Sequence, residues 1–319
     1  MSRTDKTLPP RGLIADLITP FTADGKLDAE SLERLIRLVS PHIHGMLAAG
    51  PSAGEGYALD CETRAEIMVR ALEALEGKVP LFVWITTGNI EKTFSFLETL
   101  DHAAGTTPRD LLYWIDTPLY YHSNRGLAAH YNEASGLTQR RLLLHNDPEL
   151  VSRSNKLLKR GNIRTAILKE LVQIDLIAGL VFSGSMDRAR NYQKACRLRQ
   201  GFRIYDHNEG NFLDFPSMSG VVSIGANLAP KPWHAITETS LQRTGGDTAY
   251  PDFLHQIWKM GRHVRALREA YRDTPVPVVK AALHKMGLIA SPRTIAPLDD
   301  DMSEPAKRIL GKIKELESY

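Results

Sequence analysis

The chain has 319 residues, enough for one large domain or two ordinary ones. Its 43% hydrophobic and 24% charged content is ordinary for a globular protein, and a net charge of +3 gives no support for nucleic-acid binding. No apolar run is long enough to span a membrane, and residues 1–12 lack the apolar core of a signal peptide. Cys61 and Cys196 match neither a metal-ligand spacing nor a disulfide framework. We therefore expect a cytoplasmic protein with no nucleic-acid or membrane partner.

Short apolar segments alternate with longer amphipathic ones along the first three-quarters of the sequence, and the apolar segments have the composition of buried strands. Between them, residues 28–40 and 61–75 place apolar side chains three and four apart, as helices do, and Asp28 stands where an N-cap belongs. The predicted strands cover residues 12–21, 43–50, 80–88, 110–118, 141–146, 176–182, 201–208 and 220–227.

Eight strands that are each followed by a helix can cover both sheet faces by closing into a barrel. The competing fold is a doubly wound open sheet, which would normally carry a glycine-rich phosphate loop after the first strand. Residues 18–28 (ITPFTADGKLD) do not have the pattern of such a loop. We therefore predict an α/β fold, a (β/α)₈ TIM barrel over residues 10–240. Only helical patterns follow, and they predict a C-terminal helical extension over residues 241–319.

One predicted connection, over residues 148–162, is long for a compact barrel and rich in lysine and arginine. Such a loop is either a lid over the site or a solvated excursion. The segment carries no aromatic or glycine-hinge pattern, and this favours the solvated excursion.

Polar residues follow most of the predicted strands, at the end of the barrel where reactive groups stand in this fold. The sixth strand differs, because it ends in Val181 and Phe182, which offer neither acid–base nor covalent chemistry. The candidates on the shared rim are Ser52, Gly54 and Glu55; Asp116, Tyr120, Tyr121 and His122; His145, Asn146 and Asp147; Asp206, His207, Asn208 and Glu209; and Ser223 and Asn227.

Each candidate also has a purely structural interpretation. The turn GPSAGEG (residues 50–56) could have the purely structural role of reversing the chain and capping the next helix. Alternatively, its backbone N–H groups could bind a carboxylate. The tyrosines could simply bury their rings, and His145 alone could be a hydrogen-bonded core residue. Asp206, His207 and Glu209 are metal-ligand types, but no HxH or HExxH spacing joins them. We therefore expect no metal.

Six motifs, in order along nearly the whole chain, resemble those of the dihydrodipicolinate synthase and N-acetylneuraminate lyase family. LITPFTADGKLD resembles the family's T-P-F…D-G…D opening, and GPSAGEG resembles its G-T-T-G-E turn. TPLYY resembles P-Y-Y, and LLLHNDP resembles L-Y-N-x-P. SGVVSIGAN resembles G-G-x-G-x-I-S-x-x-A-N, and PVPVVKAALHKMGL resembles P-x-P-x-K-x-x-L-x-x-x-G-L. The resemblance implies a (β/α)₈ barrel with a C-terminal helical extension, assembled as a homo-oligomer (a tetramer or a dimer).

The resemblance also implies a Schiff-base aldolase that needs no cofactor. In the family, a lysine in an I-K-[DE] motif at the end of the sixth strand forms an imine with a 2-oxo acid, usually pyruvate. A tyrosine at the end of the fifth strand moves the proton. The Thr-Thr pair of the second-strand turn binds the carboxylate and relays protons with a tyrosine of the adjacent subunit.

This sequence departs from the family where the chemistry is hardest. Val181 and Phe182 stand at the lysine and the acid of I-K-[DE], and His145 stands at the fifth-strand tyrosine. Ser52 keeps one hydroxyl of the Thr-Thr pair, and Ala53 loses the other. Valine cannot form an imine.

Other residues could take the missing roles. The relay tyrosine corresponds to Tyr120, with Tyr121 as the alternative. Lys169 lies in a helical pattern and should face solvent, whereas Lys231, after the eighth strand, could approach the barrel mouth as a relocated nucleophile. Val181 and Phe182 should make the floor of the pocket more apolar.

We therefore expect a lyase-family protein that acts on a small 2-oxo acid or related carboxylate through a mechanism without an imine. His145 is the expected acid–base residue and Tyr120 the proton relay. The residues expected to contact the substrate are Ser52, Ala53, Gly54, Val181, His207 and Gly225. The alternative is a non-catalytic regulatory subunit that binds a 2-oxo acid or carboxylate.

Overall fold

The computed structural model describes residues 8–154, 160–216, 218–241, 252–296 and 301–317. Within them, parallel strands close into a barrel in simple chain order, with the first strand paired to the last. The predicted barrel is thereby confirmed. The strands are β1 (Gly12–Asp16), β2 (Gly45–Ala48), β3 (Leu81–Trp84), β4 (Leu112–Asp116), β5 (Leu142–Asn146), β6 (Ile177–Phe182), β7 (Arg203–Asp206) and β8 (Gly220–Ser223).

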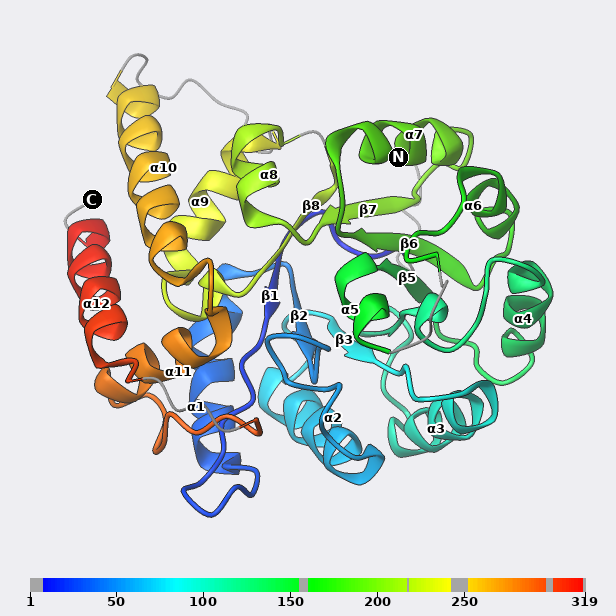
Figure 1. Cartoon of the computed structure of the whole chain (residues 1–319), viewed down its shortest axis with the longest axis horizontal. Helices are drawn as coiled ribbons and strands as arrows, with labels where there is room; N and C mark the ends of the chain where they lie inside the picture. The colour runs from blue at the N-terminus through cyan, green and yellow to red at the C-terminus, as the bar shows by residue number, and fades with distance from the viewer. Residues whose placement is uncertain (1–7, 155–159, 217, 242–251, 297–300, 318–319) are drawn as a thin grey trace.

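Helices surround the strands as an outer layer (Figure 1). Those of the barrel are α1 (Ala29–Val39), α2 (Cys61–Leu75), α3 (Ile90–Ala103), α4 (Leu127–Ala134), α5 (Pro148–Arg153), α6 (Thr165–Leu171), α7 (Met186–Cys196), α8 (Glu209–Asp214) and α9 (Pro230–Ser240). Short 3₁₀ turns are η1 (Ser40–His42), η2 (Pro118–Tyr120) and η3 (Gly225–Asn227). The C-terminal helices are α10 (Asp252–Tyr271), α11 (Pro275–Lys285) and α12 (Ser303–Glu317).

Local capping sets where several helices begin. Asp28 accepts a hydrogen bond from Ser31 N at 3.1 Å, which confirms it as the N-cap of α1. The helix then buries Leu32, Leu35 and Ile36 against the barrel. Spacings of three and four residues place these side chains on one face, so the amphipathic pattern positions the helix.

The barrel interior is filled by an inner apolar cluster that includes Val181 of β6. Its other buried members are Ile14, Leu47, Phe82, Trp84, Tyr113, Ile115, Leu143, Leu150, Tyr205 and Val222. Phe182 belongs to the outer core instead, and its ring lies 5.4 Å from that of Tyr192 on α7. The expectation that Phe182 forms part of the pocket floor is therefore wrong, because successive strand side chains point to opposite faces.

The segment after β5 is a second correction. Asp147 accepts hydrogen bonds from Glu149 N and Leu150 N, both at 3.0 Å, and Pro148 occupies the first turn of α5. Leu150 and Val151 are buried. The first part of the predicted loop is therefore a packed helix rather than a solvated excursion, whereas residues 155–159 lie outside the described residues.

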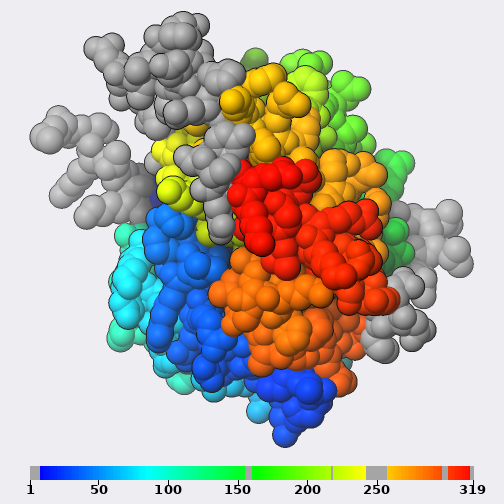
Figure 2. All heavy atoms as spheres, turned by 90° about the vertical axis from the view of Figure 1, so that its left-hand side faces the viewer, coloured from blue at the N-terminus to red at the C-terminus, as the bar shows by residue number. Residues whose placement is uncertain are grey.

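The helices of the C-terminal extension lie together on one side of the barrel, and Figure 2 shows α11 and α12 side by side next to α1. The extension is tied to the barrel by Tyr271, whose hydroxyl donates to Glu209 Oε2 at 2.7 Å. Lys280 of α11 forms a buried ion pair with Glu55 of the turn after β2. A domain boundary at residues 240 and 241 stays a prediction.

No helix among the described residues is both long enough and apolar enough to cross a membrane.

Candidate active site

The carboxyl ends of the strands surround a cavity of about 500 Å³. Its wall combines strand ends and loops with residues of the C-terminal extension, among them Arg268, Tyr271 and Arg272. The other lining residues are Asp16, Ser52, Ala53, Asp147, Pro148, Glu149, Ser183, Gly184, His207, Asn208, Glu209, Val222, Ile224, Pro275 and Val276. The predicted site residues Ser52, Ala53 and His207 thus line one cavity at the predicted end of the barrel.

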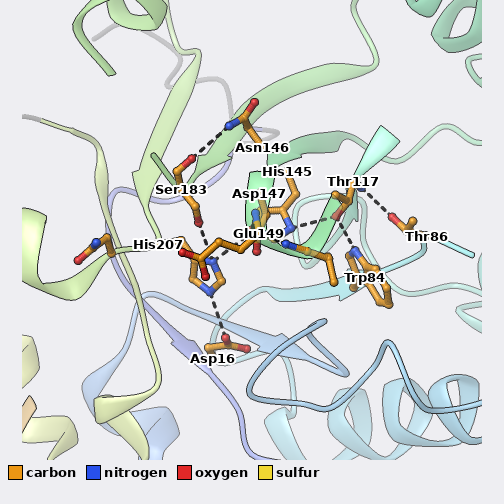
Figure 3. Close-up of polar contacts among 12 residues, drawn as sticks. Asp16, Trp84, Thr86, Thr117, His145, Asn146, Asp147, Glu149, Ser183 and His207 are labelled. Atoms are coloured by element: carbon orange, nitrogen blue, oxygen red, sulfur yellow. Dashed lines mark hydrogen bonds and ion pairs between the residues drawn. The ribbon is translucent and has the colours of Figure 1, made fainter. Parts of the chain in front are cut away.

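A pair of histidines is the centre of the polar groups at this end (Figure 3). His145 is the penultimate residue of β5 and is 2% exposed. Its Nε2 lies 3.4 Å from Nδ1 of His207, which follows β7 directly. The remaining ring nitrogen of each histidine is also bonded. Nδ1 of His145 lies 3.0 Å from Thr117 Oγ1, which accepts a hydrogen bond from Trp84 Nε1 at 2.9 Å. His207 Nε2 lies 3.3 Å from Asp16 Oδ2. Both rings are therefore held in fixed orientations.

Carboxylates flank the histidine pair. Asp147 Oδ2 lies 3.9 Å from His145 Nε2, while its Oδ1 caps α5. Asp16, at the end of β1, has one oxygen near His207 and a buried second oxygen, Oδ1, without a hydrogen-bond partner. Glu149, in the first turn of α5, is exposed and lines the same cavity. The mouth of the barrel thus gathers three carboxylates around two imidazoles.

The surroundings shift the pKa values of the two imidazoles in opposite directions. Burial lowers the pKa of His145 to about 4, against a smaller rise caused by Asp147. Burial also lowers the pKa of His207, but the hydrogen bond and charge of Asp16, with the charges of Asp147 and Asp206, outweigh it and raise the pKa overall. Two rings in contact therefore have different proton affinities.

The turn after β2 brings Ser52 and Ala53 to the cavity. Gly54 does not line it, and its carbonyl accepts a hydrogen bond from Thr19 Oγ1 at 2.8 Å. A side chain at Gly54 would place Cβ only 2.5 Å from Gly50 N, so the tight turn requires glycine there. Glu55, at the end of this turn, points away to Lys280. Thr19 and Lys280 thus hold the turn in place, and the turn presents Ser52 and Ala53 to the cavity.

The tyrosines predicted for proton relay have separate environments. Tyr121 donates to Asp116 Oδ2 at 2.7 Å and is buried among Asp116, His130 and Tyr131, so it belongs to a structural network. Tyr120 packs against the inner apolar cluster that contains Val181, and neither Tyr120 nor Val181 lines the cavity. His122 is on the surface. Tyr120 is therefore better placed than Tyr121 to serve the site.

Several other rim candidates hold the barrel together. Glu209 accepts hydrogen bonds from Ser223 Oγ, Gly225 N and Tyr271 Oη at 2.6–2.8 Å. The N–H of Gly225, expected to contact substrate, is thus bonded to Glu209, and Gly225 does not line the cavity. Asn227 Nδ2 donates to the Asp16 carbonyl at 2.8 Å and links β8 to β1.

Comparison with known proteins agrees with this architecture. Residues 9–313 match the sequence model of the Dihydrodipicolinate synthetase family. The chain belongs to this family. The 4-hydroxy-tetrahydrodipicolinate synthase of Thermotoga petrophila is 28% identical over 88% of this chain and 90% of its own length. That of Shewanella piezotolerans is 25% identical over 92% and 94%.

Solved structures of the dihydrodipicolinate synthetase family share the fold. The enzyme of Thermotoga maritima superposes with a TM-score of 0.78 at 22% identity, over 98% of this chain and 100% of its own. A chloride-inhibited dihydrodipicolinate synthase of Acinetobacter baumannii, complexed with pyruvate, also gives 0.78 at 20% identity, over 95% and 99%. The named resemblance and the fold that it implies are confirmed.

The lysines that the structure describes do not line the cavity. Among the described residues, no lysine lines the cavity, and Lys280 is the one that is buried. Burial lowers the pKa of Lys280 to about 8, but its amine is committed to Glu55. Lys169 is exposed, as predicted. Lys231 is exposed in the first turn of α9 and acts electrostatically on His42, which precedes β2, so it does not approach the mouth.

Sequence reasoning missed some residues that the structure brings to the site. Asp16 was hidden because the first strand was predicted to run to residue 21, whereas β1 ends at Asp16. A polar residue inside an apolar run was the available signal. Ser183 Oγ lies 3.3 Å from His207 Nδ1, and Thr117 orients His145. The contribution of Arg268, Tyr271 and Arg272 from α10 and the segment after it had no local signal.

Proposed function

We propose that this family member is a lyase that acts on a small 2-oxo acid through an enolate rather than an imine. The observation that supports it most directly is the contrast between neighbouring strands at the barrel mouth. In the β5–β6 register, Val181 pairs with His145, so both side chains point into the barrel. By the motif resemblance, Val181 takes the position of the family's nucleophile, and in this structure the polar histidine pair lies on the neighbouring strands.

The substrate carboxylate is proposed to bind at Ser52 and Ala53, on the turn after β2. Arg268 and Arg272 also line the cavity, and their positive charges favour the entry of an anion. The carbonyl group is then proposed to face His207, which lines the cavity and contacts His145, so that charge develops on oxygen beside the histidine pair as an enolate forms. Removal of a proton from the carbon next to the carbonyl leaves the electron pair in a new C=C bond, and Tyr120 is the proposed proton relay. The substrate class agrees with the pyruvate complex of the Acinetobacter relative.

Hydrogen–deuterium exchange tests this proposal. The full-length protein in D₂O should exchange the C3 hydrogens of pyruvate, or of another member of a 2-oxo acid panel, followed by NMR. His145→Ala should slow the exchange by roughly 100-fold or more, because half of the histidine pair proposed to serve the reaction is lost. His263→Ala is the matched control, since His263 pairs with Glu315 and does not line the cavity.

The outcomes separate the two functional hypotheses. Exchange that depends on His145 supports the lyase. Saturable binding of a 2-oxo acid without exchange contradicts it and supports the non-catalytic regulatory subunit. Absence of both binding and exchange across the panel contradicts the assignment of 2-oxo acids as the substrate or ligand class. By family resemblance we also propose a cytoplasmic homo-oligomer, a dimer or a tetramer, which light scattering during size-exclusion chromatography would measure.

A further inference from the structure

We propose that His145, His207 and Asp147 bind a divalent transition-metal cation at the mouth of the barrel. Each residue offers a ligand atom, and the three atoms lie within 4.8 Å of one another. Ligand atoms of a single zinc-type ion lie about 2.0–2.2 Å from it, hence at most about 4.4 Å apart. His145 Nε2 is 3.4 Å from His207 Nδ1 and 3.9 Å from Asp147 Oδ2, so both of these pairs fit. The third pair, His207 and Asp147, lies within the 4.8 Å limit of the cluster.

The hydrogen bonds behind the histidines orient them as metal ligands. His207 presents Nδ1 to the common point while Nε2 faces the Asp16 carboxylate, an arrangement typical of metal-bound histidine. Thr117 Oγ1 accepts one hydrogen bond from Trp84 and has a second lone pair for Nδ1–H of His145. Nε2 of His145 is then left with its lone pair directed toward His207. Figure 3 shows His207 between Asp16 and the group formed by His145 and Asp147.

The charge balance of the mouth also favours a cation. Asp16 and Asp147 are 2% and 7% exposed, and neither has an arginine or lysine within ion-pair distance among the described residues. One oxygen of Asp16 is buried without a hydrogen-bond partner. Buried carboxylates are normally paired with a positive group or a metal, because removing a charge from water is costly. A divalent ion at the histidine pair would offset the negative charges of both Asp16 and Asp147.

Asp147 can take this role without losing its structural one. Its Oδ1 caps α5 through Glu149 N and Leu150 N, while Oδ2 is the oxygen directed at His145. The two functions use different atoms. The variant Asp147→Asn therefore retains an acceptor for the cap and removes the anionic ligand.

Such an ion would stabilise the electrons released by C–H cleavage, which the side chain of Val181 cannot do. An imine stores the electron pair of the broken C–H bond, and a cation on the carbonyl oxygen stabilises the same electrons as an enolate. The C3–H bond breaks, its proton passes to a base of the cavity, and the pair forms C2=C3 with negative charge on the coordinated oxygen. Glu149 is a carboxylate of the cavity outside the ligand set that can accept this proton. This role rests on the proposed function, whereas the binding site itself rests on geometry and charge.

Binding of Mn²⁺ to the chelator-treated full-length protein tests the site, because free Mn²⁺ gives an EPR signal that binding removes. We expect saturable binding of a single ion per chain, displaced by Zn²⁺. His145→Ala and Asp147→Asn should each weaken it by about 100-fold, and Asp16→Asn by about 10-fold, since it acts through His207. His263→Ala should bind as the wild type does, and circular dichroism confirms that the variants fold.

The results distinguish this inference from the proposed function. Absence of saturable Mn²⁺ and Zn²⁺ binding, or equal binding by folded His145→Ala and Asp147→Asn, overturns the site. Deuterium exchange at an undiminished rate after chelation overturns the role of the ion and leaves the lyase intact. Specific Mn²⁺ binding without exchange of any 2-oxo acid supports the site and contradicts the proposed function.

Discussion

In the presence of pyruvate and borohydride, most chains of the Val181→Lys variant are expected to carry a covalent pyruvate adduct on residue 181. Val181 pairs in register with His145 and packs among apolar side chains of the barrel interior. An amine placed there is partly removed from water, which lowers its pKa and populates the neutral form that attacks a carbonyl. Intact mass followed by peptide mapping measures the adduct.

The controls for this substitution address shape and folding. Val181→Met has similar length but no amine, so it should give no adduct. Burial of a lysine in the apolar cluster should cost about 2–4 kcal/mol of stability, which urea unfolding measures. A folded Val181→Lys protein that pyruvate does not label would show that residue 181 does not face the carbonyl, and the comparison with the family's lysine would fail.

Lys280→Met is expected to destabilise the protein by about 3–5 kcal/mol, because it leaves the buried Glu55 carboxylate without its partner. Lys280 is fully buried, its amine also donates to the Arg293 carbonyl at 2.9 Å, and it lies 4.2 Å from the centre of the Phe21 ring. Equilibrium unfolding in urea measures the loss.

A double variant separates this ion pair from simple loss of packing. Glu55→Gln with Lys280→Met removes the uncompensated charge and should recover more than half of the lost stability. A single-variant cost below about 1 kcal/mol would contradict the assigned role of the pair. Because Glu55 ends the turn that presents Ser52, Lys280→Met should also weaken binding of a 2-oxo acid.

The barrel could be predicted from the sequence because each buried strand alternates with an amphipathic helix, a pattern set by periodicity alone. The residues at which the strands end were predicted less accurately than the order of the strands. Leu17 and Ile18 after β1 are as buried as the strand itself, so the apolar run hides Asp16 as the true end. The helix α5 did have a local signal, since Asp147 followed by Pro148 is an N-cap and first-turn pair.

The site was harder to predict because its parts meet only through the barrel register. His145 and His207 are 62 residues apart, and the intervening strand β6 pairs with both β5 and β7. A search for local ligand spacings therefore cannot find the histidine pair, although Asp147 is only two residues from His145. The alternation of Val181 inward and Phe182 outward was, by contrast, available from the two-residue period of a strand.

No amine in this cavity should capture the substrate, and treatment of the wild-type protein with pyruvate and borohydride measures this. The intact mass of the wild-type protein should stay unchanged, and Val181→Lys serves as the positive control. The experiment also covers Lys156 and Lys159, which lie outside the described residues. A stable pyruvate adduct mapped to any lysine of the wild-type chain would contradict the account.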